Sequence, residues 1–118
     1  MSESTSRDHL LACIEACEEA LHACQECAAA DIREGGAEMA ACALICLDCA
    51  DICAATLNVM ARSSAHHGDF AALCAHICRA CAAECAKHAD HHDHCARCQQ
   101  ACEACAAECD KHVAERDM

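Results

Sequence analysis

The stretch Cys42-Ala-Leu-Ile-Cys46-Leu-Asp-Cys49-Ala-Asp-Ile-Cys53 decides the fold of this chain. Its cysteines recur after four, three and four residues, which is the spacing of the a and d positions of a heptad repeat. Neither glycine nor proline interrupts the stretch, and alanine and leucine favour a helix. The pattern therefore predicts an α-helix whose buried seam, normally leucine and isoleucine, consists of thiols.

The remaining cysteines repeat this spacing in three other segments. Gaps of three or four residues separate neighbours within each segment, except for one gap of seven that skips an a/d position held by Ala20. Random placement would not keep so many cysteines on one stripe, so the grid is a property of the fold. The 17 cysteines of the grid are Cys13, Cys17, Cys24, Cys27, Cys42, Cys46, Cys49, Cys53, Cys74, Cys78, Cys81, Cys85, Cys95, Cys98, Cys102, Cys105 and Cys109.

Only three breaks separate the cysteine segments: Gly35-Gly36, the loop 63–68 and the polar run 87–94. We therefore predict an all-α fold, with residues 1–118 as a single domain built as an antiparallel up-and-down four-helix bundle with a cysteine-lined core. Helices are expected at about residues 6–32, 37–63, 69–89 and 91–114. The expected end signals are a cap at residues 5–8, a stop at Gly35 and an N-cap at Asp69.

The composition excludes several classes of protein. The chain has 118 residues, of which 56% are hydrophobic, but much of this share is alanine and cysteine, and Phe70 is its one aromatic residue. With 20 acidic and 8 basic residues, the chain offers neither a basic patch nor stacking rings for nucleic acid. No signal peptide is evident and no stretch of about 18 apolar residues is uncharged. We therefore expect a cytoplasmic protein that binds neither nucleic acid nor membrane.

Thiols in a reducing compartment point to metal more than to disulfides. Residues three or four apart on a helix have Cβ atoms about 5–6 Å apart, too far for a disulfide within one helix. Ligating sulfurs are thiolates, and a dry core cannot hold many uncompensated charges. A monovalent soft ion neutralises one thiolate each, which favours many Cu(I) ions along the core. Two alternatives stay open: a Zn(II) or Cd(II) thiolate sponge, and a structural or redox bundle whose thiols form disulfides.

The four-segment grid, together with the turn Cys85-Ala-Lys-His88-Ala-Asp-His91-His92-Asp-His94-Cys95-Ala-Arg-Cys98, resembles the bacterial copper storage proteins of the cytosolic subgroup. The resemblance covers the chain from about residue 10 to residue 112. It implies an antiparallel four-helix bundle, Cu(I) loaded along the interior, histidines at one mouth and a homotetramer. Ala20 departs from the pattern as a vacancy on the grid, so full metal occupancy is not expected near that level.

Up-and-down connectivity brings Asp31, Met39, His88 and either His91 or His92 to one end of the bundle. We hypothesise that Cu(I) enters there, and take His88 and His92 as candidate metal ligands beside the cysteines, with His91 and Met39 as secondary candidates. The favoured interpretation of His94 is a solvated turn residue. The opposite end is expected to be largely plugged by apolar side chains, its residues being Leu10, Thr56, Leu57, Met60, Phe70, His112 and Val113.

The other polar and apolar residues have simpler interpretations. His66 and His67 are expected in a solvated loop, and His9, His22 and His76 on outer faces. Large apolar residues beside the seam are expected to close contacts between helices or subunits; these are Leu11, Ile14, Leu21, Leu44, Ile45, Leu47, Ile52, Leu73 and Ile77. A third group, of acidic residues expected on a solvated face, comprises Glu15, Glu18, Glu26, Asp48, Asp51, Glu84, Glu103 and Glu108.

No motif for catalysis is present, so we predict that the chain is not an enzyme. The predicted function is storage or sequestration of many Cu(I) ions by a cytosolic homotetramer. Its predicted partners are copper ions and the proteins that donate copper to it and accept copper from it.

Overall fold

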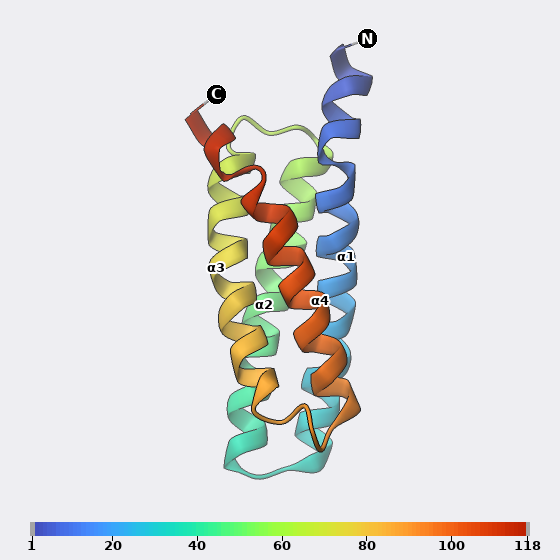
Figure 1. Cartoon of the computed structure of the whole chain (residues 1–118), viewed down its shortest axis with the longest axis vertical. Helices are drawn as coiled ribbons and strands as arrows, with labels where there is room; N and C mark the ends of the chain where they lie inside the picture. The colour runs from blue at the N-terminus through green and yellow to red at the C-terminus, as the bar shows by residue number, and fades with distance from the viewer. Residues whose placement is uncertain (1, 118) are drawn as a thin grey trace.

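The computed structural model of the chain describes the backbone of residues 2–117 and the side chains of residues 8–115. The described chain forms four long helices that run alternately up and down (Figure 1). The bundle measures 51 × 21 × 18 Å. The predicted all-α, four-helix fold is thus confirmed. Its elements are α1 (Ser2–Glu34), α2 (Ala37–Ala61), α3 (His67–Ala86), α4 (Asp93–Asp110) and the short 3-10 helix η1 (Val113–Asp117).

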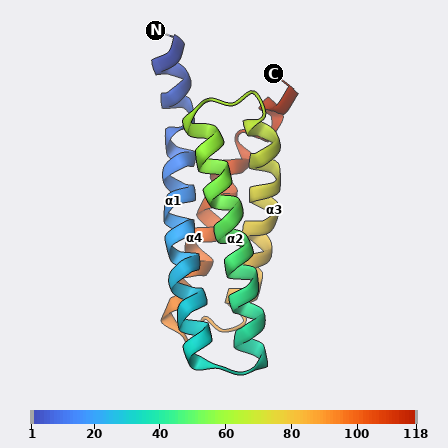
Figure 2. The same cartoon turned by 180° about the vertical axis from the view of Figure 1, so that it is seen from behind.

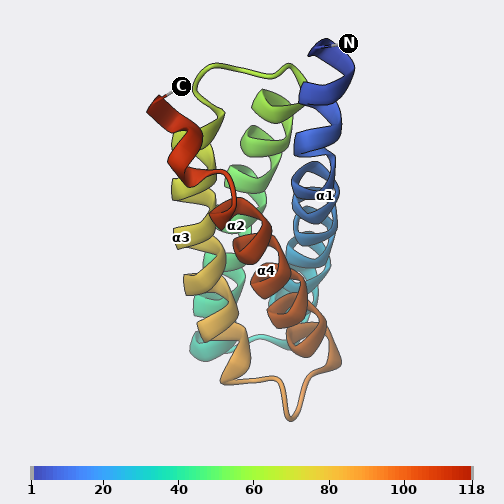
Figure 3. The ribbon, with the colours of Figure 1, turned by 45° about the horizontal axis from the view of Figure 1, so that its top comes forward.

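Each helix packs against two neighbours: α1 and α3 both contact α2 and α4. Seen from behind, α2 lies between α1 and α3 and in front of α4 (Figure 2). The α1–α2 and α3–α4 connections lie together at one end, which we call the mouth end. The α2–α3 connection lies at the other end, near both termini, and we call this the closed end (Figure 3). The cysteine seams of all four helices therefore face one shared axis.

The first helix is longer than predicted, and its predicted stop is confirmed. It begins at Ser2 instead of residue 6, so the cap expected at residues 5–8 lies inside the helix. It ends at Glu34, because Gly35 adopts a φ of 81° that glycine tolerates and donates its N–H to the Asp31 carbonyl at 3.0 Å. The second helix begins at Ala37 as predicted but ends at Ala61 instead of residue 63, where Ser63 takes a φ of 51°.

The third helix begins at His67, two residues before the N-cap predicted at Asp69. The prediction was wrong because Ser64 starts the turn: its hydroxyl accepts the N–H of His66 at 3.1 Å, and its carbonyl accepts that of His67 at 3.1 Å. Asp69 lies in the first helical turn, where a carboxylate still complements the helix dipole.

The third and fourth helices are both shorter than predicted. The third ends at Ala86 instead of residue 89, and the fourth spans Asp93–Asp110 instead of 91–114. The intervening polar run forms tight turns in which the His88 carbonyl accepts the N–H groups of His91 and His92. This run therefore folds as a loop over the mouth end.

All 17 cysteines are fully buried, and so is Ala20 on the same seam. Alanines and partly buried isoleucines pack around the thiols, among them Ile14, Ile45 and Ile77. A free thiol behaves as a small hydrophobic group, so the cysteines form the core without metal. The same side chains therefore build the bundle and line its axis.

Helix α2 is long and apolar enough to cross a membrane by length and composition, with a mean hydropathy of 1.9 in its most apolar window. The core helix of a soluble bundle meets the same criterion. Here the α2 cysteines are buried against the other helices, while Asp48 and Asp51 are exposed. The absence of membrane binding remains a prediction.

Candidate metal centre

The buried thiols form a continuous column along the bundle axis. Sγ atoms of neighbouring cysteines lie 3.6–4.0 Å apart, as in Cys17–Cys105 at 3.6 Å and Cys24–Cys81 at 4.0 Å. Most of these contacts join different helices. Every cysteine is a free thiol. A metal ion bound in the column would therefore link helices that are distant in sequence.

Groups of four Sγ atoms, all within 4.8 Å of one another, recur along this column. The groups overlap: Cys46, Cys81 and Cys85 each belong to two of them. A structural zinc site is closed at four ligands and does not share them in this way. The overlap therefore favours a chain of linked sites. Five of these groups are Cys17, Cys74, Cys105, Cys109; Cys24, Cys49, Cys81, Cys102; Cys27, Cys42, Cys46, Cys85; Cys46, Cys81, Cys85, Cys98; and Cys53, Cys74, Cys78, Cys105.

Hydrogen bonds between buried thiols shift the pKa values of the sulfurs that they join. Cys102 lies 3.6 Å from Cys24 and 3.7 Å from Cys49. The hydrogen bond between Cys24 and Cys102 raises the pKa of the Cys24 thiol, and burial raises it further. The hydrogen bond from Cys102 lowers the pKa of the Cys49 thiol. The thiols of the column therefore share protons through Sγ contacts, and a metal ion that binds two neighbouring sulfurs displaces those protons.

The protein supplies little charge to balance thiolates. Every lysine and arginine side chain within residues 8–115 is exposed on the outside of the bundle. Thiolates in the dry column must therefore be neutralised by the metal itself. A Zn(II) ion with four unshared thiolates keeps two negative charges, whereas one Cu(I) ion per thiolate leaves none. The charge balance therefore favours a monovalent soft ion.

His94 and Asp31 cover the column at the mouth end. The Asp31 side chain is fully buried and accepts hydrogen bonds from Cys27 at 3.7 Å and from Cys95 at 3.8 Å. The Nδ1 atom of His94 lies 3.4 Å from the Cys27 sulfur, 3.5 Å from the Cys95 sulfur and 3.6 Å from Asp31 Oδ1. Because the His94 side chain is 16% exposed, it contacts both solvent and the thiols of Cys27 and Cys95 at the mouth end.

The candidate ligands predicted at this mouth occupy varied positions. Met39 is buried, whereas His91 is exposed. His88 lies 3.3 Å from the Glu84 carboxylate, and the ring of His92 lies 5.3 Å from that of His94. Within the described side chains, neither His88 nor His92 hydrogen-bonds a thiol. Their role as ligands remains a prediction.

Sequence reasoning assigned His94 to a solvated turn, and the structure places it against the thiols. Counting a and d positions backwards from Cys95 along a continuous helix leads to His91. Helix α4 begins only at Asp93, so residue 91 lies in the turn and residue 94 in the first helical turn. The position of His94 directly before Cys95 was the available signal.

The closed end is more polar than predicted. Leu10, Thr56 and Met60 are buried there as expected, and His112 is buried as well. However, His67 is not a solvated loop residue: its side chain is 17% exposed and bonds Glu115. The reason is that η1 packs against α3 at this end and brings Glu115 to the histidines. Leu57, Phe70 and Val113 are partly buried around them.

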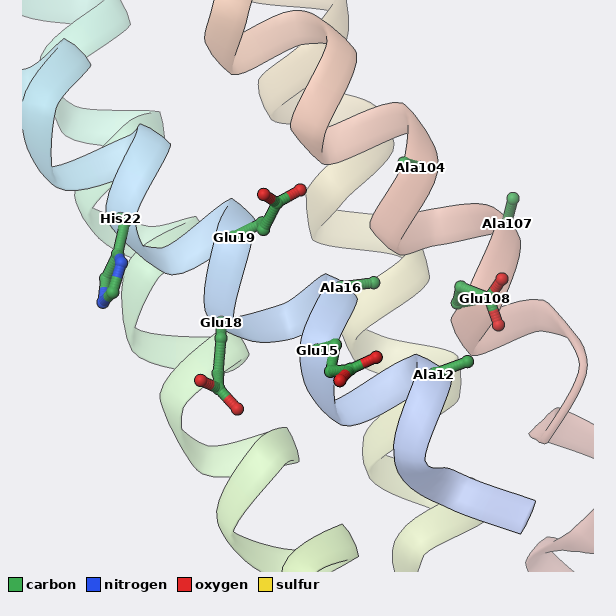
Figure 4. Close-up of a pocket in the computed structure, with 9 residues that line it drawn as sticks. All are labelled: Ala12, Glu15, Ala16, Glu18, Glu19, His22, Ala104, Ala107 and Glu108. Carbon is green, nitrogen blue, oxygen red and sulfur yellow. The ribbon is translucent and has the colours of Figure 1, made fainter. Parts of the chain in front are cut away.

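The groove between α1 and α4 is a separate surface feature (Figure 4). It has a volume of about 810 Å³, and its lining includes Ala12, Ala16, Glu15 and Glu108 but no cysteine. Of the eight acidic residues predicted to face outward, six are exposed; Glu84 and Glu108 are partly buried. The acidic residues therefore form an outer surface that does not open on the thiol column.

Removing the Glu115 charge is expected to destabilise the closed end in a pH-dependent way. Burial opposes ionisation, but hydrogen bonds from His67, His9 and His112 lower the Glu115 pKa from 4.5 to about 2. The stability that the ionised Glu115 carboxylate gives the folded protein is fully present above pH 4.5 and is lost as the pH falls toward 2. Burial would lower the pKa of His67, but the contact with Glu115 raises it above 6.5. The stability that protonated His67 gives the folded protein is therefore lost as the pH rises through this raised pKa.

We therefore expect Glu115→Gln to lower the melting temperature of the copper-free protein by about 4 °C, most strongly between pH 4.5 and 6.5. Thermal unfolding followed by circular dichroism across the pH range measures this. Glu18→Gln, which removes an exposed charge, is the control. Equal melting temperatures for the two variants at pH 5.5 would contradict the expectation.

The fold and the thiol column together define a class: a four-helix bundle that sequesters soft metal ions in its core. Within this class, the family model of the copper storage proteins matches residues 6–114. The chain belongs to the copper storage protein family.

Solved structures and a curated relative agree with this assignment. The Cu(I)-bound copper storage protein BsCsp3 is 39% identical, with a TM-score of 0.84, over 89% of this chain and 98% of that one. A cytosolic copper storage protein from Streptomyces lividans, solved with five coppers, is 35% identical with a TM-score of 0.87, over 94% of this chain and 97% of that one. The cysteine-rich protein YhjQ of Bacillus subtilis is 41% identical over 78 residues, which is 65% of this chain and 72% of YhjQ.

Proposed function

We propose that this chain stores Cu(I) ions in the cytoplasm, with the thiolates of its 17 cysteines as ligands. The overlapping four-sulfur groups carry this proposal, because they offer linked sites along the whole column. The Cu(I)-bound state of BsCsp3 and the copper-loaded Streptomyces lividans protein support the choice of metal. Anaerobic Cu(I) titration, described in the Discussion, tests it against the Zn(II), Cd(II) and disulfide alternatives.

Cu(I) enters this store at the mouth end. His94 supplies an imidazole that contacts both solvent and the Cys27 and Cys95 thiols, and the buried Asp31 carboxylate adds negative charge beside them. Neutral imidazole and thioether hold Cu(I) less tightly than thiolate pairs, so an ion passes from them to the column. His88, His92, His91 and Met39 surround this path as further candidate ligands.

Replacing His94 by alanine is expected to slow copper loading. The His94→Ala variant loses the group that links solvent to Cys27 and Cys95, so the first phase of Cu(I) uptake should slow by about tenfold, while the final capacity falls by one ion at most. Stopped-flow absorbance in the thiolate-to-Cu(I) charge-transfer region measures the rate. His76→Ala, which removes an exposed histidine from the outer face of α3, is the control.

The His88→Phe/His92→Phe double variant tests the other predicted mouth ligands in the same assay. If that variant loads at the wild-type rate while His94→Ala is slow, uptake depends on His94 alone among these histidines. Wild-type rates in all variants would overturn uptake at the mouth end.

The chain forms a homotetramer in this proposal. Leu11, Ile32, Leu44, Leu47 and Leu73 are between 39% and 65% exposed, and they leave apolar surface on the outside of the bundle for contacts between subunits. Four of them were expected beside the seam, closing contacts between helices or subunits. Native mass spectrometry should show four chains, and Leu44→Glu should shift the mass toward smaller species. The copper donor and acceptor proteins, and the absence of enzymatic activity, remain predictions.

A further inference from the structure

Three histidines converge on one carboxylate at the closed end, outside the thiol column. Glu115 Oε2 lies 2.8 Å from His9 Nε2, and Glu115 Oε1 lies 2.8 Å from His67 Nε2 and 3.1 Å from His112 Nδ1. The rings of His9 and His112 meet edge to face with centroids 4.8 Å apart. These residues come from α1, α3, η1 and the turn before η1, so only the folded chain brings them together. We call them the histidine cluster.

The ring of His67 is held between two acceptors. Its Nδ1 atom lies 2.8 Å from the Ser64 carbonyl, which can only accept a hydrogen bond, and its Nε2 atom faces the Glu115 carboxylate. A neutral imidazole donates through one nitrogen only, so Nδ1–H to Ser64 leaves a lone pair on Nε2 that points at a carboxylate. This position requires a cation: either a proton on Nε2 or a metal ion between Nε2 and the carboxylate.

Metal-binding histidines are oriented in the same way: one ring nitrogen donates a hydrogen bond to a backbone carbonyl, and the other nitrogen is free to bind the metal. The Glu115, His67 and His112 side chains are 18%, 17% and 4% exposed, whereas that of His9 is 57% exposed, so three of the four groups are shielded and His9 lies at the solvent edge of the cluster. A cavity of about 490 Å³ reaches it, lined in part by His9, Leu10, Ser64, His67 and Glu115. An ion can therefore reach the cluster without passing through the thiol column.

We propose that His9, His67, His112 and Glu115 form a second metal site, selective for a divalent cation of the Zn(II) class. Imidazole and carboxylate groups suit Zn(II), whereas Cu(I) selects the thiolates of the column, so ligand type keeps the two metals apart. The cation replaces the protons that hold the cluster together and cross-links α1, α3 and the C-terminal segment. The site adds a structural metal to the closed end, distinct from the stored metal.

The test uses Co(II) as a spectroscopic substitute for Zn(II). The reduced protein is first filled with Cu(I), and the remaining free thiols are counted. Co(II) is then added, and one equivalent per chain should bind with the visible d–d bands of a nitrogen and oxygen site. The near-ultraviolet charge-transfer band of Co(II)–thiolate should be absent, because Cu(I) occupies the sulfurs.

Matched variants locate the site. His67→Gln and Glu115→Gln should each weaken Co(II) binding by at least about tenfold, whereas His66→Gln, which changes the exposed neighbour, should leave it unchanged. Circular dichroism verifies that the variants keep the helical content of the wild type. The His67→Gln and His66→Gln variants are also compared in copper-free protein, so that the test of this site does not depend on copper loading. Loss of one Co(II) equivalent with non-thiolate bands in His67→Gln, but not in His66→Gln, supports the site.

Three results would overturn the proposal: no Co(II) binding to the filled protein, Co(II) bands of thiolate type only, or equal binding by His67→Gln and His66→Gln. The thiol count before Co(II) addition shows separately whether the column accepts Cu(I). A failure of the copper store is therefore distinguishable from a failure of this site.

Discussion

Cu(I) added without oxygen to the reduced, copper-free protein is expected to bind until nearly all of the 17 thiols are coordinated, at roughly one ion per thiol. The expectation follows from charge. No lysine or arginine side chain within residues 8–115 is buried beside the column, so each thiolate needs a positive charge from the metal. Overlapping groups such as those sharing Cys46 and Cys85 let neighbouring ions use common sulfurs.

The measurement is a titration of Cu(I) against a competing chelator, with free thiols counted before and after. Saturation at a few ions, or displacement of bound Cu(I) by a modest excess of Zn(II), would contradict copper storage and favour the zinc or cadmium sponge. Loss of thiols before metal is added would favour the disulfide bundle. Each alternative therefore has its own signature in one experiment.

Two single substitutions calibrate the capacity. Cys78→Ala removes one sulfur from the middle of the column, and Ala20→Cys places a thiol at the one vacant seam position, where the alanine is fully buried. We expect the first to lower the capacity by about one ion and the second to raise it by about one, because charge balance ties ions to thiolates. An unchanged capacity in both variants would mean that the column does not set the number of ions.

The second large effect is on stability. Copper loading is expected to raise the melting temperature by more than about 20 °C. The copper-free core contains small side chains, cysteine and alanine, so it buries little apolar area for each residue. An ion held at a thousandfold excess over its Kd adds about 4 kcal/mol, and several such ions exceed the 5–15 kcal/mol typical of a whole domain.

The ions also act where the fold needs support, because sulfurs from different helices lie side by side, as Cys24 does with Cys102 and Cys49 with Cys78. Scanning calorimetry of copper-free and loaded protein measures the shift. Removal of Cu(I) by a strong chelator, which should restore the copper-free melting temperature, is the control. A loaded protein that melts within a few degrees of the copper-free one would show that copper does not bridge the helices.

The fold was predictable because one periodic signal runs through the chain. The cysteine spacing of three and four residues sets which face of each helix is buried, and Gly35 ends the first helix because of its positive φ. Both are local properties. Less predictable were the helix ends near His67 and Asp93, since the hydroxyl of Ser64 and the turns around His88 set them.

The two ends of the bundle show where local patterns stop being informative. His94 lies outside the a/d register, yet its ring reaches Cys27 on α1 across the mouth end. Glu115 is 106 residues from His9 and 48 from His67, and only the packing of η1 against α3 joins them. No periodicity of a single helix encodes such contacts.

The order of residues alone was therefore enough for the class of fold, the burial of every cysteine and the soft-metal chemistry of the core, because heptad spacing acts over one or two helical turns. Tertiary structure decided which sulfurs share a site, which histidine touches the thiols and that the closed end carries a polar cluster. Those features depend on distances between different helices and turns, which follow only once all four helices are packed together.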